Sequence, residues 1–221
     1  MPNAETSEGE GSLVVVTARR IRERLIAGDL PPGRKLSEAG LAAELGVSRN
    51  TLREVFRLLT SQRLLTYIPN RGVFVAAPHE AAVIDIYRVR LVIQKGAIAA
   101  TTPGHPALAR MREVSDRSQK AGERGDWPLV GTLNLEFHRT MVELCESERL
   151  SACFELVLAE LRLVFGQVKD TAHLHAPFIE LNAALLSALE TGRLAEASAQ
   201  LDSYLIRSER SVLAVISRIR R

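Results

Sequence analysis

The segment from Val47 to Leu58 constrains the fold more than any other part of the chain, because it has the pattern of a capped amphipathic helix. Ser48 is a residue type that favours the position just before a helix. Apolar residues recur at three- and four-residue spacing, at Leu52, Val55, Phe56 and Leu59. Arg49, Arg53 and Arg57 therefore lie off the packed face, where a helix can present donors to a DNA major groove.

A second predicted helix lies directly upstream, from Ser37 to Leu45, and carries its own apolar face. Gly46 follows it at a position that suits the left-handed conformation in which helices commonly end. The two helices and the short turn between them make a helix-turn-helix. Further upstream, apolar residues at helical spacing predict a supporting helix from about Val15 to Ala27.

Two short β-prone runs follow these helices, from Leu64 to Ile68 and from Val73 to Ala76. They flank the turn-forming stretch from Pro69 to Gly72, which predicts a β-hairpin with Arg71 at its tip. Three helices followed by a hairpin with a basic tip make a winged helix-turn-helix. We assign this domain to residues 13–77.

The positive charge of the chain is concentrated in this predicted domain. Residues 13–78 hold 11 Lys and Arg against 5 Asp and Glu, whereas residues 79–221 hold 18 basic and 18 acidic residues. Residues 1–12 are acidic and rich in Glu, Gly and Ser, and are predicted to be a disordered tail. An amphipathic helix with arginines is often only a solvated surface helix. Because binding to phosphates requires surplus cationic side chains, the distribution favours DNA binding over that alternative.

The rest of the chain predicts an all-helical second domain, from residue 78 to 221. No segment after Glu80 alternates like a strand, and breakers separate the helical blocks. His173 to Pro177 is predicted as a loop. We expect a mainly α fold in which a helical bundle follows the winged domain. The six predicted helices cover about 80–101, 105–122, 127–146, 149–170, 177–190 and 193–218.

Composition excludes several classes of protein. With 46% hydrophobic and 25% charged residues, the 221-residue chain has an ordinary globular balance, enough for two modest domains. No apolar run approaches the roughly 20 residues of a membrane span, and the acidic start lacks the features of a signal peptide. We therefore expect no membrane association and a cytoplasmic location. The motifs of nucleophilic hydrolases and of phosphate-cradling loops are absent, so an enzyme is not expected.

The winged segment shares a long series of residues, in order and spacing, with a known family. The shared positions are Ile21, Leu25, Gly28, Pro32-Gly33, Leu36, Leu41-Ala42, Leu45 to Arg49, Leu52-Arg53-Glu54, Arg71-Gly72 and Phe74-Val75. Over residues 15 to 77 the chain thus resembles the GntR family of bacterial transcription regulators. Two positions depart from the pattern: Arg63 stands where a glycine is usual, and Gly40 weakens the second helix by roughly 1 kcal/mol relative to alanine. The order of wing, linker and helical bundle resembles the branch with an FCD-type C-terminal domain.

This resemblance implies a ligand-responsive regulator that binds a palindromic operator in double-stranded DNA as a homodimer. Arg49 and Arg53 are expected in the major groove and Arg34 on the DNA backbone. The wing is expected to reach toward the minor groove. Repression relieved by a ligand is the commoner behaviour in the family. The full set of expected DNA-binding residues is Arg34, Ser48, Arg49, Asn50, Arg53, Arg71 and Gly72.

FCD domains often hold a metal through an aspartate and three histidines. At the matching positions this chain has Asn134, His138, Asn182 and Tyr204, so only one histidine is retained. Amides, a phenol and one imidazole form a poor set for a divalent transition metal, and no bound metal or other cofactor is expected. The same groups are suitable hydrogen-bonding partners for a small organic effector.

Arg90 matches a family arginine that commonly faces the ligand, and its usual acidic partner is replaced by Gln94. A guanidinium without that partner can hold a carboxylate in a bidentate pair, so the expected effector is a small organic acid. Three alternatives stay open. Arg90 could be solvated or pair with a glutamate of a neighbouring helix; the protein could be a metal-dependent sensor that uses His138 with unidentified ligands; or the bundle could serve only for dimerisation.

Overall fold

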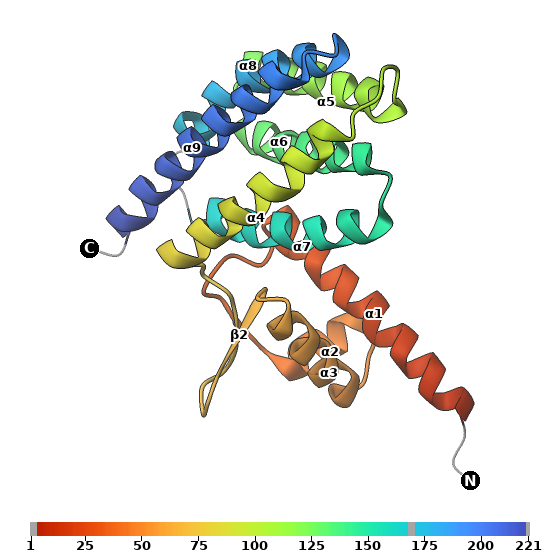
Figure 1. The fold of residues 1–221 in the computed structure, drawn as a ribbon. Coiled ribbons are helices and arrows are strands. Elements are labelled where there is room, and N and C mark those ends of the chain that lie inside the picture. Colours follow the sequence, from red (N-terminus) through yellow and green to blue (C-terminus); the bar gives the residue numbers. More distant parts are fainter. Residues whose placement is uncertain (1–3, 168–170, 220–221) are drawn as a thin grey trace. The chain divides into compact units, whose positions relative to one another are not determined.

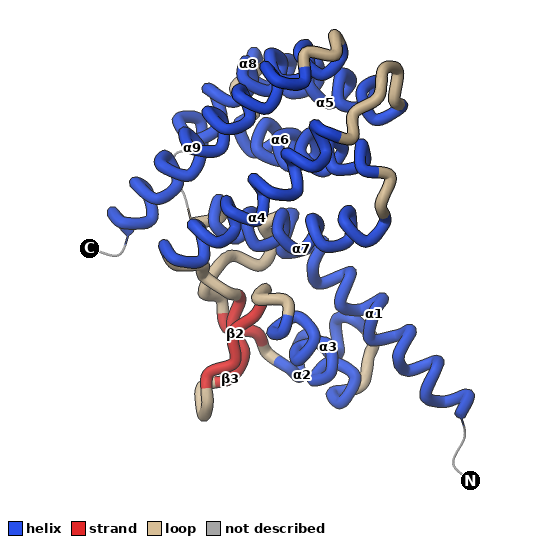
Figure 2. Tube along the Cα trace, in the orientation of Figure 1, coloured by secondary structure: helices blue, strands red, loops and turns tan. Residues whose placement is uncertain are grey.

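The computed structural model describes residues 4–167 and 171–219 of the chain (Figures 1 and 2). These residues form two compact units. Residues up to Pro78 make the first unit together with Arg162–Gln167, which include the last turn of one bundle helix, and the remaining bundle residues make the second. No helix among the described residues is long and apolar enough to cross a membrane.

The first unit is a winged helix-turn-helix, as predicted. Its helices precede a small antiparallel sheet, coloured red in Figure 2. In chain order the elements are α1 (Ala4–Ala27), β1 (Lys35–Leu36), α2 (Glu38–Leu45), α3 (Arg49–Ser61), β2 (Leu65–Ile68) and β3 (Gly72–Val75). The helix α1 begins upstream of the expected start at Val15. The assignment of residues 1–12 as a tail and the two domain boundaries remain predictions.

Local capping sets the bounds of α2 and α3. The Ser37 hydroxyl accepts a hydrogen bond from the Gly40 backbone N–H at 3.2 Å, and the Ser48 hydroxyl accepts one from the Thr51 N–H at 3.0 Å. Between the helices, Gly46 adopts the left-handed conformation, with φ 68°, and its N–H caps the end of α2. Three short-range signals therefore specify the helix-turn-helix.

The buried face of α3 is the one that the spacing predicted. Leu52, Val55 and Leu59 are fully buried, and Phe56 is nearly so. They share the core with Ile21 and Leu25 of α1, with Leu64 just before β2, and with Val75 of β3. Because the apolar residues of α3 are used in this way, its arginines are left on the opposite, exposed face.

The wing is the hairpin of β2 and β3, paired in antiparallel register from Leu65 with Val75 to Ile68 with Gly72. A third strand, β1, completes the sheet in the order β1-β3-β2. Sequence reasoning missed β1, because two residues are too short to show an alternating pattern. Gly72 has φ 103°, which explains why a glycine stands at the end of the turn.

Arg63 also adopts a left-handed backbone, with φ 59°, just after α3. Such a conformation favours glycine, because a side chain clashes with the backbone there. The structure thus gives the physical reason why a glycine is usual at this position, and nothing in the structure explains the arginine.

The second unit is an all-helical bundle. The helix α6 packs against α4, α5 and α8, while α9 packs against α4 and α8. The helices are α4 (Glu80–Ala99), α5 (Pro106–Glu123), α6 (Trp127–Val142), α7 (Glu148–Phe165), α8 (Thr171–Glu190) and α9 (Leu194–Ile219), with a short 3-10 turn, η1 (Glu143–Cys145), after α6.

The prediction of a loop from His173 to Pro177 was wrong, because α8 begins at Thr171 and contains Pro177. A proline inside a helix removes a hydrogen bond and costs about 3 kcal/mol. Here Leu174, His175 and Phe178 are buried, so packing of the first turns offsets that cost. The side chain of His173 lies outside the described residues.

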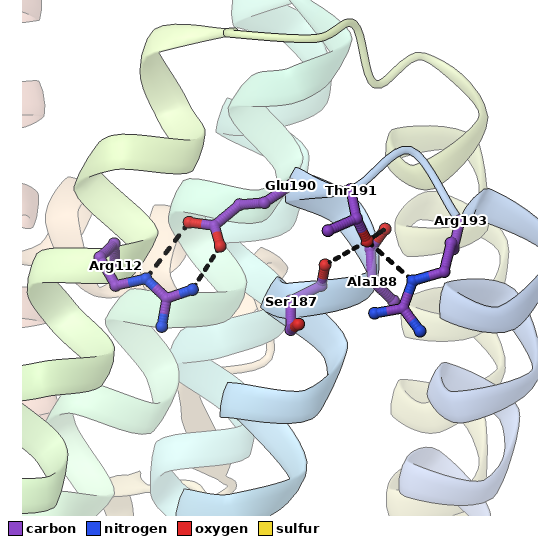
Figure 3. Close-up of polar contacts among 6 residues, drawn as sticks. All are labelled: Arg112, Ser187, Ala188, Glu190, Thr191 and Arg193. Carbon is purple, nitrogen blue, oxygen red and sulfur yellow. Dashed lines mark hydrogen bonds and ion pairs between the residues drawn. The ribbon is translucent and has the colours of Figure 1, made fainter.

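Surface contacts fix the end of α8 against its neighbours (Figure 3). Arg112 of α5 donates to both carboxylate oxygens of Glu190, with Nε to Oε1 at 3.2 Å. At the turn into α9, Arg193 Nε donates to the Thr191 hydroxyl at 2.8 Å, and that hydroxyl donates to the Ser187 carbonyl at 2.7 Å. The first pair joins α5 to the end of α8, and the other two contacts lie at the end of α8 and in the turn that leads into α9.

Candidate DNA-binding surface and buried polar site

The first turn of α3 presents Ser48, Arg49 and Asn50 to solvent, as predicted. Among the described residues, no hydrogen bond or ion pair engages the Arg49 guanidinium, so it is free to meet a base or phosphate. Arg34 is exposed beside the sheet and donates to the Asp29 carbonyl, at 3.0 Å. At the wing tip, the exposed Arg71 guanidinium lies 5.8 Å from the centre of the Phe74 ring.

Arg53 is also exposed, but it has an acidic partner in the free protein. Its Nε donates to Glu38 Oε2 at 2.9 Å, which joins α3 to the first turn of α2. Both side chains line a hollow of about 680 Å³ between α3 and the wing, and Tyr67 of β2 lines it as well. Tyr67 is 62% exposed. Sequence reasoning missed Glu38 and Tyr67, since only the fold brings them beside Arg53.

Glu38→Gln is expected to tighten binding to DNA of any sequence by about two- to fivefold at low salt. The substitution removes a negative charge from the surface that meets phosphates and releases Arg53, and an exposed pair of this kind holds only about 0.2–1 kcal/mol. Fluorescence anisotropy with a labelled duplex at several salt concentrations measures the change. Glu44→Gln is the matched control, because Glu44 pairs with Arg24 of α1. Weaker binding by the Glu38 variant would show instead that Glu38 orients Arg53.

The six residues predicted to line an effector site come together inside the bundle. They project from four helices, α4, α6, α8 and α9, and all are at least 90% buried. The residues are Arg90, Gln94, Asn134, His138, Asn182 and Tyr204. A set of polar side chains this deep in a helical bundle requires hydrogen-bond partners, since unpaired polar groups are costly to bury.

Asn134 is the hydrogen-bonding centre of one half of this site. Its Oδ1 accepts from Asn182 Nδ2 at 2.7 Å and from the Tyr204 hydroxyl at 2.8 Å. A single side-chain oxygen of α6 thus links α8 and α9. Burial raises the pKa of the Tyr204 phenol well above its usual value, so the hydroxyl keeps its proton and donates.

His138 occupies the other half. Its Nδ1 lies 2.6 Å from Gln94 Nε2, which also approaches the sulfur of Met141 at 3.6 Å. Burial, and next the positive charge of Arg90, hold the pKa of His138 well below its ordinary value, so the ring is neutral. Because Nδ1 accepts from the amide, the proton of the neutral ring is on Nε2. Nε2 has no hydrogen-bond partner among the described residues.

Neutral His138 makes the stability of the protein depend on pH. The unfolded chain takes up a proton near the ordinary pKa of 6.5, whereas the folded chain does not. The contribution of neutral His138 to the free energy of unfolding is therefore complete above pH 6.5. Below that pH it is lost, by about 1.4 kcal/mol for each pH unit. Urea unfolding from pH 7 to pH 5 measures the slope. In His138→Gln the slope should be shallower, and an unchanged slope would contradict the assignment.

Arg90 is the unusual member of the site. The side chain is 1% exposed, and its guanidinium carbon lies 4.9 Å from the centre of the Tyr87 ring. Within residues 4–167 and 171–219 no carboxylate forms an ion pair with it. The negative charge of half-exposed Glu209, on α9, contributes to the raised pKa of Tyr87, but Glu209 does not form an ion pair with Arg90. The expected alternative of a structural glutamate partner is therefore not seen among the described residues.

Within the part of the chain that the structure describes, two nitrogens of Arg90, Nε and Nη2, are buried without a hydrogen-bond partner. So are the oxygens Gln94 Oε1 and Asn182 Oδ1. The site therefore combines unused donors and unused acceptors within one set of mutually contacting side chains. The sequence did not indicate Tyr87 and Ser208, whose hydroxyls lie 2.6 Å apart beside Arg90.

The site does not fit the metal that FCD domains often hold. The described residues contain no group of three or more His, Cys, Asp or Glu that could bind an ion. The one carboxamide oxygen at the aspartate position, Asn134 Oδ1, is already used by two donors. In metal sites the second ring nitrogen of a histidine donates to its neighbour, whereas Nδ1 of His138 accepts from an amide.

Comparison with known proteins decides the family. Residues 14–75 match the profile of bacterial regulatory proteins of the gntR family, and residues 85–207, more than half of the chain, match that of the FCD domain. The chain belongs to the GntR family, in its FCD branch. This is a family of transcription regulators rather than enzymes, so the expected fold class and non-enzymatic character are confirmed.

Solved structures of GntR proteins have the same fold. A crystal structure from Rhodococcus sp. RHA1 shares 33% identity, covers 92% of this chain and 98% of its own, and has a TM-score of 0.85. McbR of E. coli, at 22% identity, covers 95% of this chain and 99% of its own, with a TM-score of 0.74, and shows likeness of fold only.

Curated relatives include operon regulators. The Nta operon transcriptional regulator of Aminobacter aminovorans is 31% identical over 54% of this chain and 57% of its own, so the chain spans just over half the length of this relative. The gluconate operon repressor of Bacillus subtilis is 33% identical over 38% of this chain and 35% of its own.

Proposed function

We propose that this GntR protein is a cytoplasmic transcription regulator, a repressor of an operon, that binds a palindromic operator as a homodimer and is released by a small organic acid bound in its FCD domain. The DNA half of the proposal is supported by the exposed first turn of α3, where Ser48, Arg49 and Asn50 face solvent, and by the basic wing tip. A relative named as an operon repressor supports repression rather than activation of transcription.

The observation that carries the effector half is Arg90. A buried cation without a counter-ion costs several kcal/mol. Among the described residues Arg90 has no counter-ion, inside a bundle that could equally have been packed with apolar residues. An organic anion would supply the missing charge and hydrogen bonds. A bundle that served only for dimerisation would have no need of this arrangement.

Selection of bound duplexes from random DNA tests the DNA half. We expect the enriched sequences to contain two inverted half-sites, because a twofold-symmetric dimer presents two copies of α3. Light scattering should give the mass of two chains for the free protein, and the mass of two chains plus one duplex for the complex. Enrichment of single half-sites, or the mass of one chain bound to DNA, would contradict the dimer.

A further inference from the structure

We propose that the hollow between α3 and the wing holds the sugar–phosphate backbone of one DNA strand, and that Tyr67 contacts this strand directly. The Tyr67 hydroxyl donates to a phosphate, and the ring packs against a deoxyribose. This inference rests on DNA binding by the winged helix-turn-helix and is independent of any effector. It adds to the DNA-binding surface a residue that the pattern of basic and polar residues did not indicate.

Tyr67 lies at the edge of the core of the winged domain. It stands opposite Val73 in the pairing of β2 with β3, on the same face of the hairpin as Leu65 and Val75. All three of these aliphatic side chains are buried, whereas Tyr67 is 62% exposed. Among the described residues no hydrogen bond engages its hydroxyl. The wing therefore holds a large aromatic side chain with a free donor outside the core, on the face that lines the hollow.

The opposite wall of the hollow belongs to the later turns of α3. Arg53, Arg57 and Thr60 line it at four- and three-residue spacing, so they share one side of the helix. The buried side chains of Phe56 and Val73 line the hollow as well. Apolar side chains beside cationic and hydroxyl groups match a DNA backbone, in which sugars alternate with anionic phosphates.

The length of α3 places these later turns at a backbone rather than at base edges. The residues that a recognition helix presents to base edges are those at its N-terminus, here the turn that Arg49 opens. With a rise of about 1.5 Å per residue, Arg57 lies about 12 Å and Thr60 about 16 Å further along the helix axis. A major groove is only about 12 Å wide. The later turns therefore lie at the rim of the groove, where the phosphates run.

The two arginines of this wall have exposed acidic partners in the free protein. Arg53 pairs with Glu38 at 2.9 Å. Arg57 pairs with Glu54 at 2.7 Å. Pairs this exposed are weak, so phosphates can replace the carboxylates. A tyrosine has no positive charge and releases no counterion when it binds a phosphate, so the salt dependence of DNA binding separates the role of Tyr67 from that of the arginines.

Fluorescence anisotropy with two labelled duplexes, the selected operator and a duplex of mixed sequence, tests the contact. Tyr67→Phe removes only the hydroxyl, and we expect it to weaken binding to both duplexes alike, by about three- to tenfold. The slope of affinity against salt should stay unchanged in this variant, whereas in Arg57→Ala it should fall by about one. Thr66→Val is the matched control, because it removes an exposed hydroxyl from the opposite face of β2 and should bind DNA like the parent protein.

Single methylphosphonate substitutions along the operator locate the contact. Each substitution removes the charge of one phosphate. At one phosphate of each bound site, we expect the substitution to weaken binding by the parent protein more than binding by Tyr67→Phe, since only the parent protein has a hydroxyl to lose there. The two proteins should melt at the same temperature without DNA, because the Tyr67 side chain is exposed.

Four results would overturn the contact while leaving a DNA-binding regulator intact. They are equal binding by Tyr67→Phe and the parent protein, a loss confined to the operator, an equal effect of every methylphosphonate on both proteins, and a lower melting temperature of Tyr67→Phe that accounts for its weaker binding. If the parent protein binds neither duplex, both the contact and the proposed regulator fail.

Discussion

Arg90→Met is expected to reduce the affinity for the acid effector at least 100-fold and, without effector, to raise the melting temperature. Methionine fills much of the same volume without charge. Exchanging a buried, unpaired guanidinium for it removes a desolvation cost, a change that can stabilise a protein by about 1–4 kcal/mol. Effector binding falls because the charge-assisted bidentate pair is lost. Few substitutions of a buried residue raise stability and remove function together, so the combination is diagnostic.

Thermal melts with and without the acid measure both effects in one experiment. Arg88→Met is the matched control, because Arg88 is an exposed arginine of the same helix, α4. We expect this control to melt and to bind acid like the parent protein. A lower melting temperature in Arg90→Met together with unchanged acid binding would mean that Arg90 has a purely structural role.

Arg49→Ala should weaken operator binding by about 1–3 kcal/mol, or roughly 5- to 150-fold, while binding to unrelated DNA changes little. The reason is its position. Arg49 opens α3, is exposed, and has no partner among the described residues, so its guanidinium can pair with the edge of a guanine.

Titrations of labelled operator and scrambled duplex, at one salt concentration, separate base recognition from phosphate contact. Arg57→Ala is the control. Arg57 lies two turns further along α3 and pairs with Glu54 at 2.7 Å, so its loss should affect both duplexes alike. An equal loss on both duplexes for Arg49→Ala would reassign this residue to the DNA backbone.

The helix-turn-helix could be predicted closely because its signals are local. Ser37, Gly46 and Ser48 act within one turn of their own positions, and the apolar spacing of α3 identifies its buried face. Prediction from the sequence failed for two elements whose bounds depend on packing between segments far apart in the chain. Burial around Pro177 continues α8 where the proline indicated a loop, and β1 exists only because β3 pairs with it.

The buried polar site shows a similar division. Its members could be predicted from resemblance to the family, but not their hydrogen bonds. Arg90 and Tyr204 are far apart in the chain, and only packing of α4 against α9 brings them together. Arg90 lacks a counter-ion among the described residues, and Asn134 is already engaged by two donors. Both facts depend on distances between four helices. Sequence spacing within one helix carries no such information.

The most direct test of an acid-responsive regulator is to add the acid to the protein–operator complex and follow the release of labelled operator by fluorescence anisotropy. We predict that the acid releases the operator from the parent protein, whereas Arg90→Met binds the same operator with similar affinity and keeps it at every acid concentration. Equal release from both proteins, or release from neither by an acid that binds the parent protein, would contradict the account.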